Sequence, residues 1–380
     1  MIIVNENNSK NNIIVLKEEG VVGRLIVFLI LLSFFFSQFY FWSSGFPQFS
    51  HIFILSAIFL FFIKNIEIDI KKSKNIILLV SYISCVNFFW CLINFDYSYI
   101  SSTIYWIFNL FFFLLMISLN QSQQNFIFEK ILLIIPFSYI LEISIWMIGL
   151  GRHNFEPRYN GLFNDPNQMA FWVLSTCAIF LYISKNSFNK ILIYFLALFL
   201  ILLTLSRSAS LGFLVLSLGF ILSQKGNMNK RIILFFAYLL FLGTLSYFLY
   251  LYGYFDSIVT RFFEGLEQKN NQVEGRGFFY FLDHPQYLIF GTGQGGYGLY
   301  NSTGSEIHST WFGVLFYYGV IGFSLFLFFI YQIFNKLSFS NKMIFLGPMV
   351  YGFTTYNART LIFWFLLSTF FLFSNNNKEK

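Results

Sequence analysis

Long apolar runs are the feature of this sequence that most restricts its possible folds. Most of them approach or exceed the roughly 20 residues that a helix needs to cross a bilayer, whereas a transmembrane barrel would show alternating segments of about 10 residues. The sequence therefore predicts an all-α integral membrane protein, a polytopic helical bundle of about 12 transmembrane helices. The spans are expected at 22–42, 47–63, 75–95, 99–118, 131–150, 167–184, 191–205, 208–223, 232–252, 309–333, 343–356 and 360–374.

The composition agrees with this class of protein. Of the 380 residues, 57% are hydrophobic and 11% are charged, whereas a water-soluble domain carries about 25% charged residues. The net charge is +7, yet the lysines fall in short loops between apolar runs, so we expect the lipid bilayer and no nucleic acid as a partner. Cys85, Cys91 and Cys177 lie inside apolar runs without a CxxC pair, which predicts neither a metal cluster nor a disulfide framework.

The distribution of basic residues predicts the orientation of the chain. With both termini in the cytoplasm, 17 of the 24 basic residues lie inside and 7 lie outside, as the positive-inside rule requires. On this topology 15 of the 16 lysines are inside, while 6 of the 8 arginines are outside. The first apolar run has no small-residue cleavage site after it and is expected to remain as an anchor. The outer face thus carries a single lysine and retains most of the arginines.

Two regions of the predicted bundle are unusual. The spans 191–205 and 208–223 are short, and Lys190 and Lys225 flank them on the same side, so they are expected to form a hairpin whose turn is Ser206-Arg207-Ser208. The segment 253–308 is the largest outer loop, with one or two short helices expected before a glycine-rich stretch. No second soluble domain is expected, so 1–380 form a single polytopic membrane domain.

The outer arginines are the first candidates for a binding site. A guanidinium group grips phosphate with two parallel hydrogen bonds and stays charged, so arginines beside a membrane suit a lipid-linked phosphate or pyrophosphate. Arg207 lies between two short spans, where a cation is costly and usually functional. Arg152 and Arg158 lie in "GRHNFEPRYNG"; as an alternative, each pairs with an acid or reaches the interface.

Two further outer arginines have alternatives of their own. Arg276 in "EGRGFF" is a candidate for phosphate contact, and a salt bridge with Glu274 or Glu267 is the alternative. Arg359 in "TTYNART" is a candidate substrate-binding residue, and an interfacial anchor is the alternative.

His308 and Glu142 are the other candidates. His308 precedes the span 309–333, where its imidazole is suited to act as a general base, or alternatively to cap the helix. Glu142 is an acid inside the span 131–150, which marks it as a substrate-binding candidate or as a hydrogen-bond partner of a neighbouring helix. Asp165-Pro166-Asn167 is typical of an Asx turn that leads into a helix. The "GTGQGGYG" stretch lacks the strand and helix of a dinucleotide site, and we expect no cofactor and no metal.

Several of these motifs, taken in order, carry a family resemblance. They are "RYNGLFNDPNQMA", "LLTLSRSASLGFLV", an outer loop with "GR", "HP" and "GTGQGGYG", and "HSTWFGVLFYYGVIGF". Together they resemble the O-antigen polymerase and O-antigen ligase superfamily of bacterial membrane glycosyltransferases, over the core 150–330. The resemblance implies a helical fold of the GT-C type and inverting, metal-independent transfer of sugars carried on undecaprenyl pyrophosphate, at the periplasmic face of the inner membrane.

The resemblance also implies roles for single residues. Arg207 and Arg276 would contact the pyrophosphate, and His308 would occupy the base position, although "IHS" departs from the proline, histidine and asparagine often found there. The expected function is an O-antigen or capsular polysaccharide polymerase, and a chain-length regulator protein is a candidate partner. The alternatives are an O-antigen ligase, a lipid-linked oligosaccharide flippase and a non-enzymatic assembly partner. A flippase would place charges along a central cavity, where this chain offers only Glu142.

Overall fold

The computed structural model describes residues 20–42, 47–64, 68–152, 155–223, 280–296 and 306–376, together with Gly243, Tyr247 and Gly277. Over these residues the fold is all-α, and β-type pairing is confined to two isolated bridges in the 151–161 loop. The chain divides into two compact units. Unit 1 comprises Met1–Ser138, Gly277–Lys336 and Gly352–Lys380, and unit 2 comprises Tyr139–Arg276 and Leu337–Tyr351.

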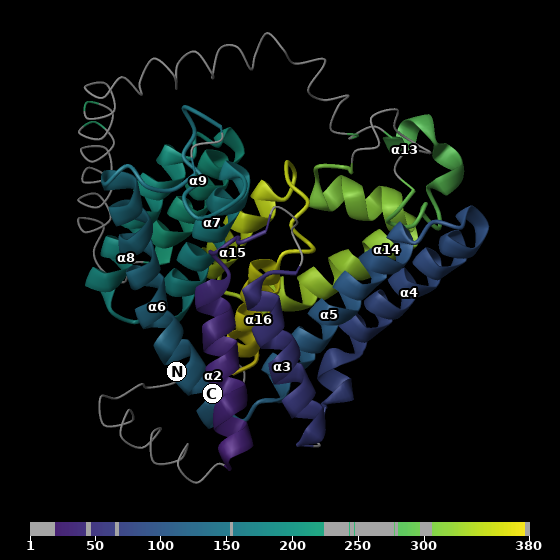
Figure 1. The fold of residues 1–380 in the computed structure, drawn as a ribbon, viewed down its shortest axis with the longest axis horizontal. Helices are drawn as coiled ribbons and strands as arrows, with labels where there is room; N and C mark the ends of the chain where they lie inside the picture. The colour runs from purple at the N-terminus through teal and green to yellow at the C-terminus, as the bar shows by residue number, and fades with distance from the viewer. Residues whose placement is uncertain are drawn as a thin grey trace. The chain divides into compact units, whose positions relative to one another are not determined.

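Eleven of the twelve expected spans each contain one helix, labelled in Figure 1. The expected span 232–252 lies outside the described residues, apart from Gly243 and Tyr247. The helices are α2 (Val21–Phe36), α3 (Phe49–Ile63), α4 (Ile70–Asn94), α5 (Ser98–Ser118), α6 (Gln121–Met147), α7 (Pro166–Ile183), α8 (Ser187–Leu203), α9 (Arg207–Ser223), α14 (Thr310–Phe334), α15 (Phe339–Tyr351) and α16 (Leu361–Asn376). Among these, α4, α5, α7 and α14 are long and apolar enough to cross a membrane, and five others are shorter apolar helices. The described helices are therefore those of a helical membrane protein.

Side-chain caps fix the starts of several helices. The Asp165 carboxylate accepts a hydrogen bond from the Asn167 N–H at 2.6 Å, and Pro166 occupies the first turn of α7, which confirms the expected Asx turn. Asp69 caps α4 by accepting from the Lys72 N–H at 3.1 Å. This hydrogen bond, together with the Lys72 ammonium, lowers the pKa of the Asp69 carboxyl.

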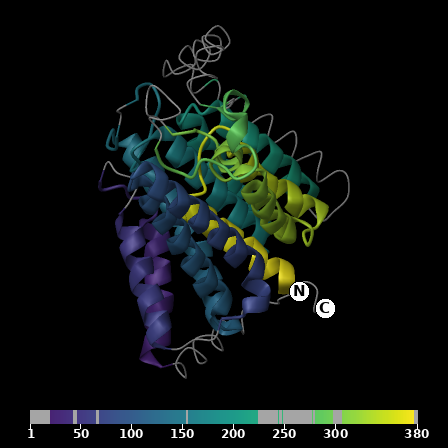
Figure 2. The same ribbon diagram turned by 90° about the vertical axis from the view of Figure 1, so that its right-hand side faces the viewer.

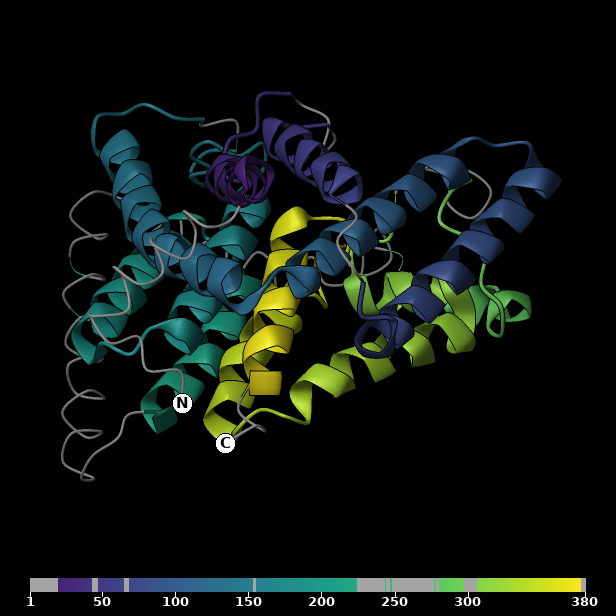
Figure 3. The same ribbon diagram turned by 90° about the horizontal axis from the view of Figure 1, so that it is seen from below.

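Unit 1 is built from helix pairs that are joined by aromatic contacts. Helices α2 and α3 lie side by side (Figures 1 and 2), and α4 packs along both α5 and α14 (Figure 3). Phe365 of α16 meets Phe34 at 5.0 Å and Phe112 at 4.5 Å between ring centroids. Trp364 meets Trp106 of α5 edge-on at 5.9 Å. Aromatic rings from α2, α5 and α16 thus pack together in the core of this unit.

Helix α14 is interrupted at Gly319, which adopts φ 64° and ψ −174°. The interruption leaves backbone groups without helical partners, and the segment after the 3₁₀ turn η1 (Pro285–Tyr287) supplies them. The Val320 N–H donates to the Leu288 carbonyl at 2.8 Å, and the Gly293 N–H donates to the Tyr317 carbonyl at 2.8 Å. Within a membrane protein, non-helical backbone of this kind is tolerated only where protein groups satisfy it.

The described part of the predicted 253–308 loop agrees with the expectation of short helices followed by a glycine-rich stretch. The short helix α13 (Tyr280–Asp283) and η1 come first, and the non-helical residues 291–296 follow. All of residues 291–296 are buried. Residues 291–296 are therefore an internal part of unit 1.

Unit 2 contains α7, α8, α9 and α15, with very close approach between α9 and α15. A Cβ atom on Gly212 would lie 2.6 Å from the Gly347 carbonyl oxygen, and one on Gly219 would lie 2.6 Å from the Ile344 nitrogen. The two backbones touch because these positions carry no side chain.

The two short spans form separate helices, as expected. Their turn comprises residues 204–206, with Leu205 in the left-handed region at φ 49°. Arg207 is therefore the first residue of α9 rather than the middle of the turn.

Candidate functional site

Arg158 is a buried cation in unit 2, with 7% of its surface exposed. Its Nε donates to the Thr204 carbonyl at 3.0 Å, and its Nη2 donates to Asn167 Oδ1 at 2.7 Å. Thr204 follows α8, and Asn167 lies in the first turn of α7. Arg158 thus ties the 151–165 loop to the start of α7 and to the α8–α9 turn.

Arg207 follows Ser206, which shares the Asn167 side-chain oxygen with Arg158. The Ser206 hydroxyl donates to Asn167 Oδ1 at 3.4 Å and lies 3.4 Å from the Ser208 hydroxyl. Arg207 itself is exposed at the first position of α9. Hydrogen bonds thus join Arg158, Asn167, Ser206 and Ser208, and Arg207 stands between the two serines in the chain. We call these five residues the Arg158–Arg207 cluster.

The electrostatics of the Arg158–Arg207 cluster favour an anion. The N-terminal end of a helix carries a partial positive charge and directs N–H groups outward, so it attracts phosphate and carboxylate. A cation at that end gains nothing from the helix, because the dipole repels it. The stability of α9 therefore does not explain the position of Arg207, and the charge there would suit an anionic ligand.

Arg152 and Glu142 are also placed in unit 2, around the 151–161 loop. The Arg152 N–H donates to the Gly161 carbonyl at 2.9 Å, and its guanidinium hydrogen-bonds Asn164 Oδ1. Glu142 of α6 is fully buried, and its carboxylate lies against Gly161. The Tyr159 hydroxyl donates to the Glu142 carbonyl at 3.2 Å, and burial raises the pKa of Tyr159. Both residues therefore support the loop that carries Arg158.

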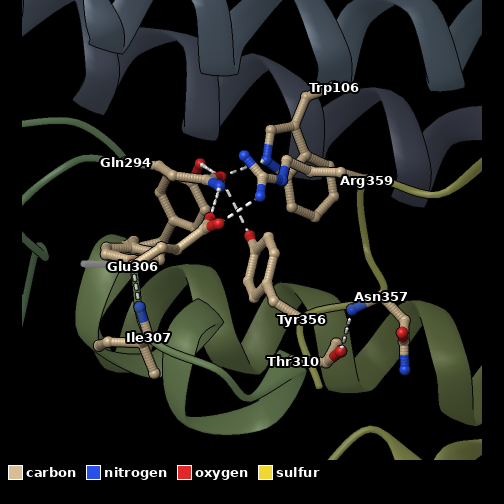
Figure 4. Close-up of polar contacts among 10 residues, drawn as sticks. Trp106, Gln294, Glu306, Ile307, Thr310, Tyr356, Asn357 and Arg359 are labelled. Atoms are coloured by element: carbon tan, nitrogen blue, oxygen red, sulfur yellow. Dashed lines mark hydrogen bonds and ion pairs between the residues drawn. The ribbon is translucent and has the colours of Figure 1, made fainter. Parts of the chain in front are cut away.

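Unit 1 contains a second polar cluster, which joins Arg359, Glu306 and Gln294 (Figure 4). Arg359 forms an ion pair with Glu306 Oε2, and its guanidinium lies 5.6 Å from the Tyr105 ring centroid and 5.5 Å from that of Tyr356. Gln294 Nε2 donates to Glu306 Oε1 at 2.8 Å. Both carboxylate oxygens of Glu306 are thus engaged.

Gln294 is fully buried at the centre of this cluster (Figure 4). Its Oε1 accepts from Trp106 Nε1 at 3.2 Å and from the hydroxyls of Tyr318 and Tyr356 at 3.0 Å each. Its backbone N–H donates to Asn87 Oδ1 at 2.8 Å. A buried amide is costly unless its partners are present, and here they come from four parts of unit 1.

His308 is exposed between the buried residues Ile307 and Ser309. His308 does not cap α14. The cap is its neighbour Ser309, whose hydroxyl accepts a hydrogen bond from the Phe312 N–H at 3.2 Å. The imidazole is therefore available for another role.

The structure thus groups the described sequence candidates by unit. Arg158 and Arg207 share one cluster of unit 2, with Arg152 and Glu142 around the adjoining loop, whereas Arg359 and His308 belong to unit 1. Arg276, with its alternative partners Glu267 and Glu274, lies outside the described residues. Within the described residues, no group of three or more His, Cys, Asp or Glu side chains is arranged to hold a metal ion.

Sequence reasoning missed Asn167, Gln294 and Glu306. The Asn167 side chain was detectable, because it stands in the first turn of a capped helix beside two candidate arginines. Glu306 was detectable only as an acid near the outer histidine. Gln294 gave no signal, since its partner Trp106 is 188 residues away in sequence.

No protein-family model matches this chain, and no curated protein matches it.

Proposed function

We propose that this protein is a membrane glycosyltransferase of the GT-C type. It joins repeat units of a surface polysaccharide, each carried on undecaprenyl pyrophosphate, at the periplasmic face of a bacterial inner membrane. The observation that carries the proposal is the Arg158–Arg207 cluster, where the buried Arg158 hydrogen-bonds the first turn of α7 and the exposed Arg207 begins α9. The order of the sequence motifs, which resembles polysaccharide polymerases and ligases, supports the same substrate class.

In this proposal the Arg158–Arg207 cluster holds the pyrophosphate of the donor. Negative charge grows on the leaving pyrophosphate as the bond between the sugar and the phosphate breaks. Guanidinium groups that are already in place stabilise this charge without reorganising, and Arg158 is fixed by its bonds to Thr204 and Asn167. Arg276 is proposed as a further contact to the same group.

The acceptor is the hydroxyl of a sugar on a second lipid-linked repeat unit. Its oxygen attacks the anomeric carbon from the face opposite the pyrophosphate, which inverts that carbon. The hydroxyl proton passes to a general base, a role for which the order of the sequence motifs suggests His308, and the pyrophosphate leaves as an anion. The bond that forms joins the growing chain, as donor, to the new repeat unit.

The test is a polymerisation assay with purified protein in lipid nanodiscs, using undecaprenyl-pyrophosphate-linked repeat units as the only substrate. Arg207→Ala is expected to lower turnover at least about 100-fold, as the loss of one fixed donor to a developing anion does. Arg24→Ala, which removes an exposed arginine from α2, is the matched control and is expected to keep full turnover. Full activity of a double variant with Arg207→Ala and Arg276→Ala would contradict the pyrophosphate grip.

A further inference from the structure

His308 is the exposed member of a short segment whose other residues are held. Ile307 is 2% exposed, Ser309 is fully buried, and Thr310 is 2% exposed. The Glu306 side chain is 16% exposed. An exposed imidazole therefore projects from a backbone that is fixed on both sides.

Two anchors hold the segment before His308 (Figure 4). Glu306 is gripped by the Arg359 guanidinium and by Gln294 Nε2. The Ile307 N–H donates to the hydroxyl of Tyr317 at 2.9 Å. Arg359 stacks on aromatic rings and Gln294 is fully buried, so both partners of Glu306 are themselves immobilised.

Two further anchors hold the segment after His308. The Ser309 hydroxyl donates to the Gly352 carbonyl at 3.3 Å, and the Thr310 N–H donates to the same carbonyl at 2.7 Å. Thr310 Oγ1 donates to the Thr355 carbonyl at 2.9 Å and accepts from the Asn357 N–H at 2.8 Å. The segment thus has a polar anchor at every residue except His308.

We infer that Glu306 and Tyr317 are positioning residues that hold His308 where it receives the acceptor proton. The inference rests on the proposed function, because it assigns these residues to the base of that reaction. A general base must lie within hydrogen-bond reach of its proton, and a misplacement of about 1 Å costs on the order of 100-fold in rate. In this role the Arg359 guanidinium anchors Glu306.

Tyr317→Phe is the sharpest test, because it removes one oxygen and keeps the ring. We expect kcat for polymerisation to fall about tenfold or more while KM for the lipid-linked donor changes less than about twofold. Tyr331→Phe is the matched control on the same helix, since that side chain is 56% exposed, and it is expected to leave both constants unchanged.

Glu306→Ala and Glu306→Gln provide an independent series. The alanine variant loses both anchors of the carboxylate, whereas glutamine keeps the volume and one acceptor oxygen, so kcat is expected to be lower for alanine than for glutamine. Thermal unfolding of each purified variant, measured in one detergent for all of them, shows how much of the variant is folded. A fall in turnover that is fully explained by loss of folded protein would overturn the inference.

The remaining outcomes separate the two proposals. Wild-type turnover together with unchanged kcat in Tyr317→Phe and Glu306→Gln overturns the positioning role alone. A raised KM with an unchanged kcat also overturns it, because these residues would then act in donor binding. A wild-type protein that makes no polymer from lipid-linked repeat units overturns the proposed function, and the positioning role falls with it.

Discussion

At the scale of single residues, the two arginines of the Arg158–Arg207 cluster have different surroundings. Arg158 is buried, and two of its N–H groups donate to protein oxygens. A buried guanidinium requires such hydrogen-bond partners. Arg207 is exposed and stands where the helix dipole disfavours a cation. We propose that Arg158 organises the anion site and that Arg207 supplies the more accessible charge.

Asn167 is predicted to be essential to this organisation, because its side-chain oxygen accepts from Arg158 and from Ser206. Asn167→Ala removes a hydrogen bond to a charged group, so unfolding should become easier by about 1.5–3 kcal/mol. Polymerisation should fall about tenfold, since about 1.4 kcal/mol of lost transition-state stabilisation has that effect. Turnover and thermal unfolding measure the two effects.

Asn189→Ala is the control for this change, since Asn189 is exposed on α8. Equal turnover and equal stability in the two variants would contradict the role assigned to Asn167.

Local chemistry was predictable at this scale, whereas long-range pairing was not. The Asx turn at Asp165 follows from adjacent residues, and Arg207 was marked by its place between two short spans. The Gln294 network required residues 188 and 62 positions away, Trp106 of α5 and Tyr356 between α15 and α16, to meet one amide oxygen. No pattern in one sequence encodes such a meeting, because hydrophobic periodicity fixes helices but not their neighbours.

At the scale of the elements, the interrupted helix α14 is the main departure from the predicted bundle. The run 309–333 is apolar throughout, and a glycine in an apolar run is compatible with a continuous helix. The interruption depends on the 288–293 segment, which pairs with the freed backbone. Eleven of the twelve predicted spans nevertheless contain a described helix, because length and hydropathy alone identify apolar helices.

Gly319→Ala is predicted to destabilise unit 1. Its φ of 64° is strained for any residue with a Cβ, and that Cβ would meet the Ile289 carbonyl. We expect a loss of at least about 1–3 kcal/mol from backbone strain alone, seen as a lower thermal-unfolding temperature in detergent. Gly20→Ala, at a position with open space around it, should leave that temperature unchanged. Equal unfolding temperatures in the two variants would show that α14 is not interrupted at Gly319.

The close packing of α9 against α15 leads to a similar prediction for unit 2. Gly219→Ala places a Cβ 2.6 Å from the Ile344 nitrogen and 2.7 Å from the Ser340 oxygen, so the helices must separate. Overpacking of this kind costs typically about 1–3 kcal/mol, which thermal unfolding measures. Leu218→Ala, at a 56% exposed neighbour, should cost much less. Greater destabilisation by Leu218→Ala than by Gly219→Ala would show that α9 packs differently.

At the scale of the whole molecule, the sequence predicts which loops face each side of the membrane. Cysteine labelling tests this after Cys85, Cys91 and Cys177 are replaced by serine. A membrane-impermeant maleimide added from the periplasmic side should label Tyr97→Cys, at a side chain that is 79% exposed, and should not label Ser187→Cys. Labelling of Ser187→Cys alone would show that the chain has the opposite orientation, with the Arg158–Arg207 cluster on the cytoplasmic side.

The measurement that tests the central claim most directly is the ladder of surface polysaccharide on a gel, taken from the source strain after deletion of this gene. The proposed polymerase predicts collapse of the ladder to lipid A-core that bears a single repeat unit. Lipid A-core without any repeat unit, with polymer accumulating on undecaprenyl pyrophosphate, would instead identify a ligase. An unchanged ladder would contradict the claim that this protein assembles that polysaccharide.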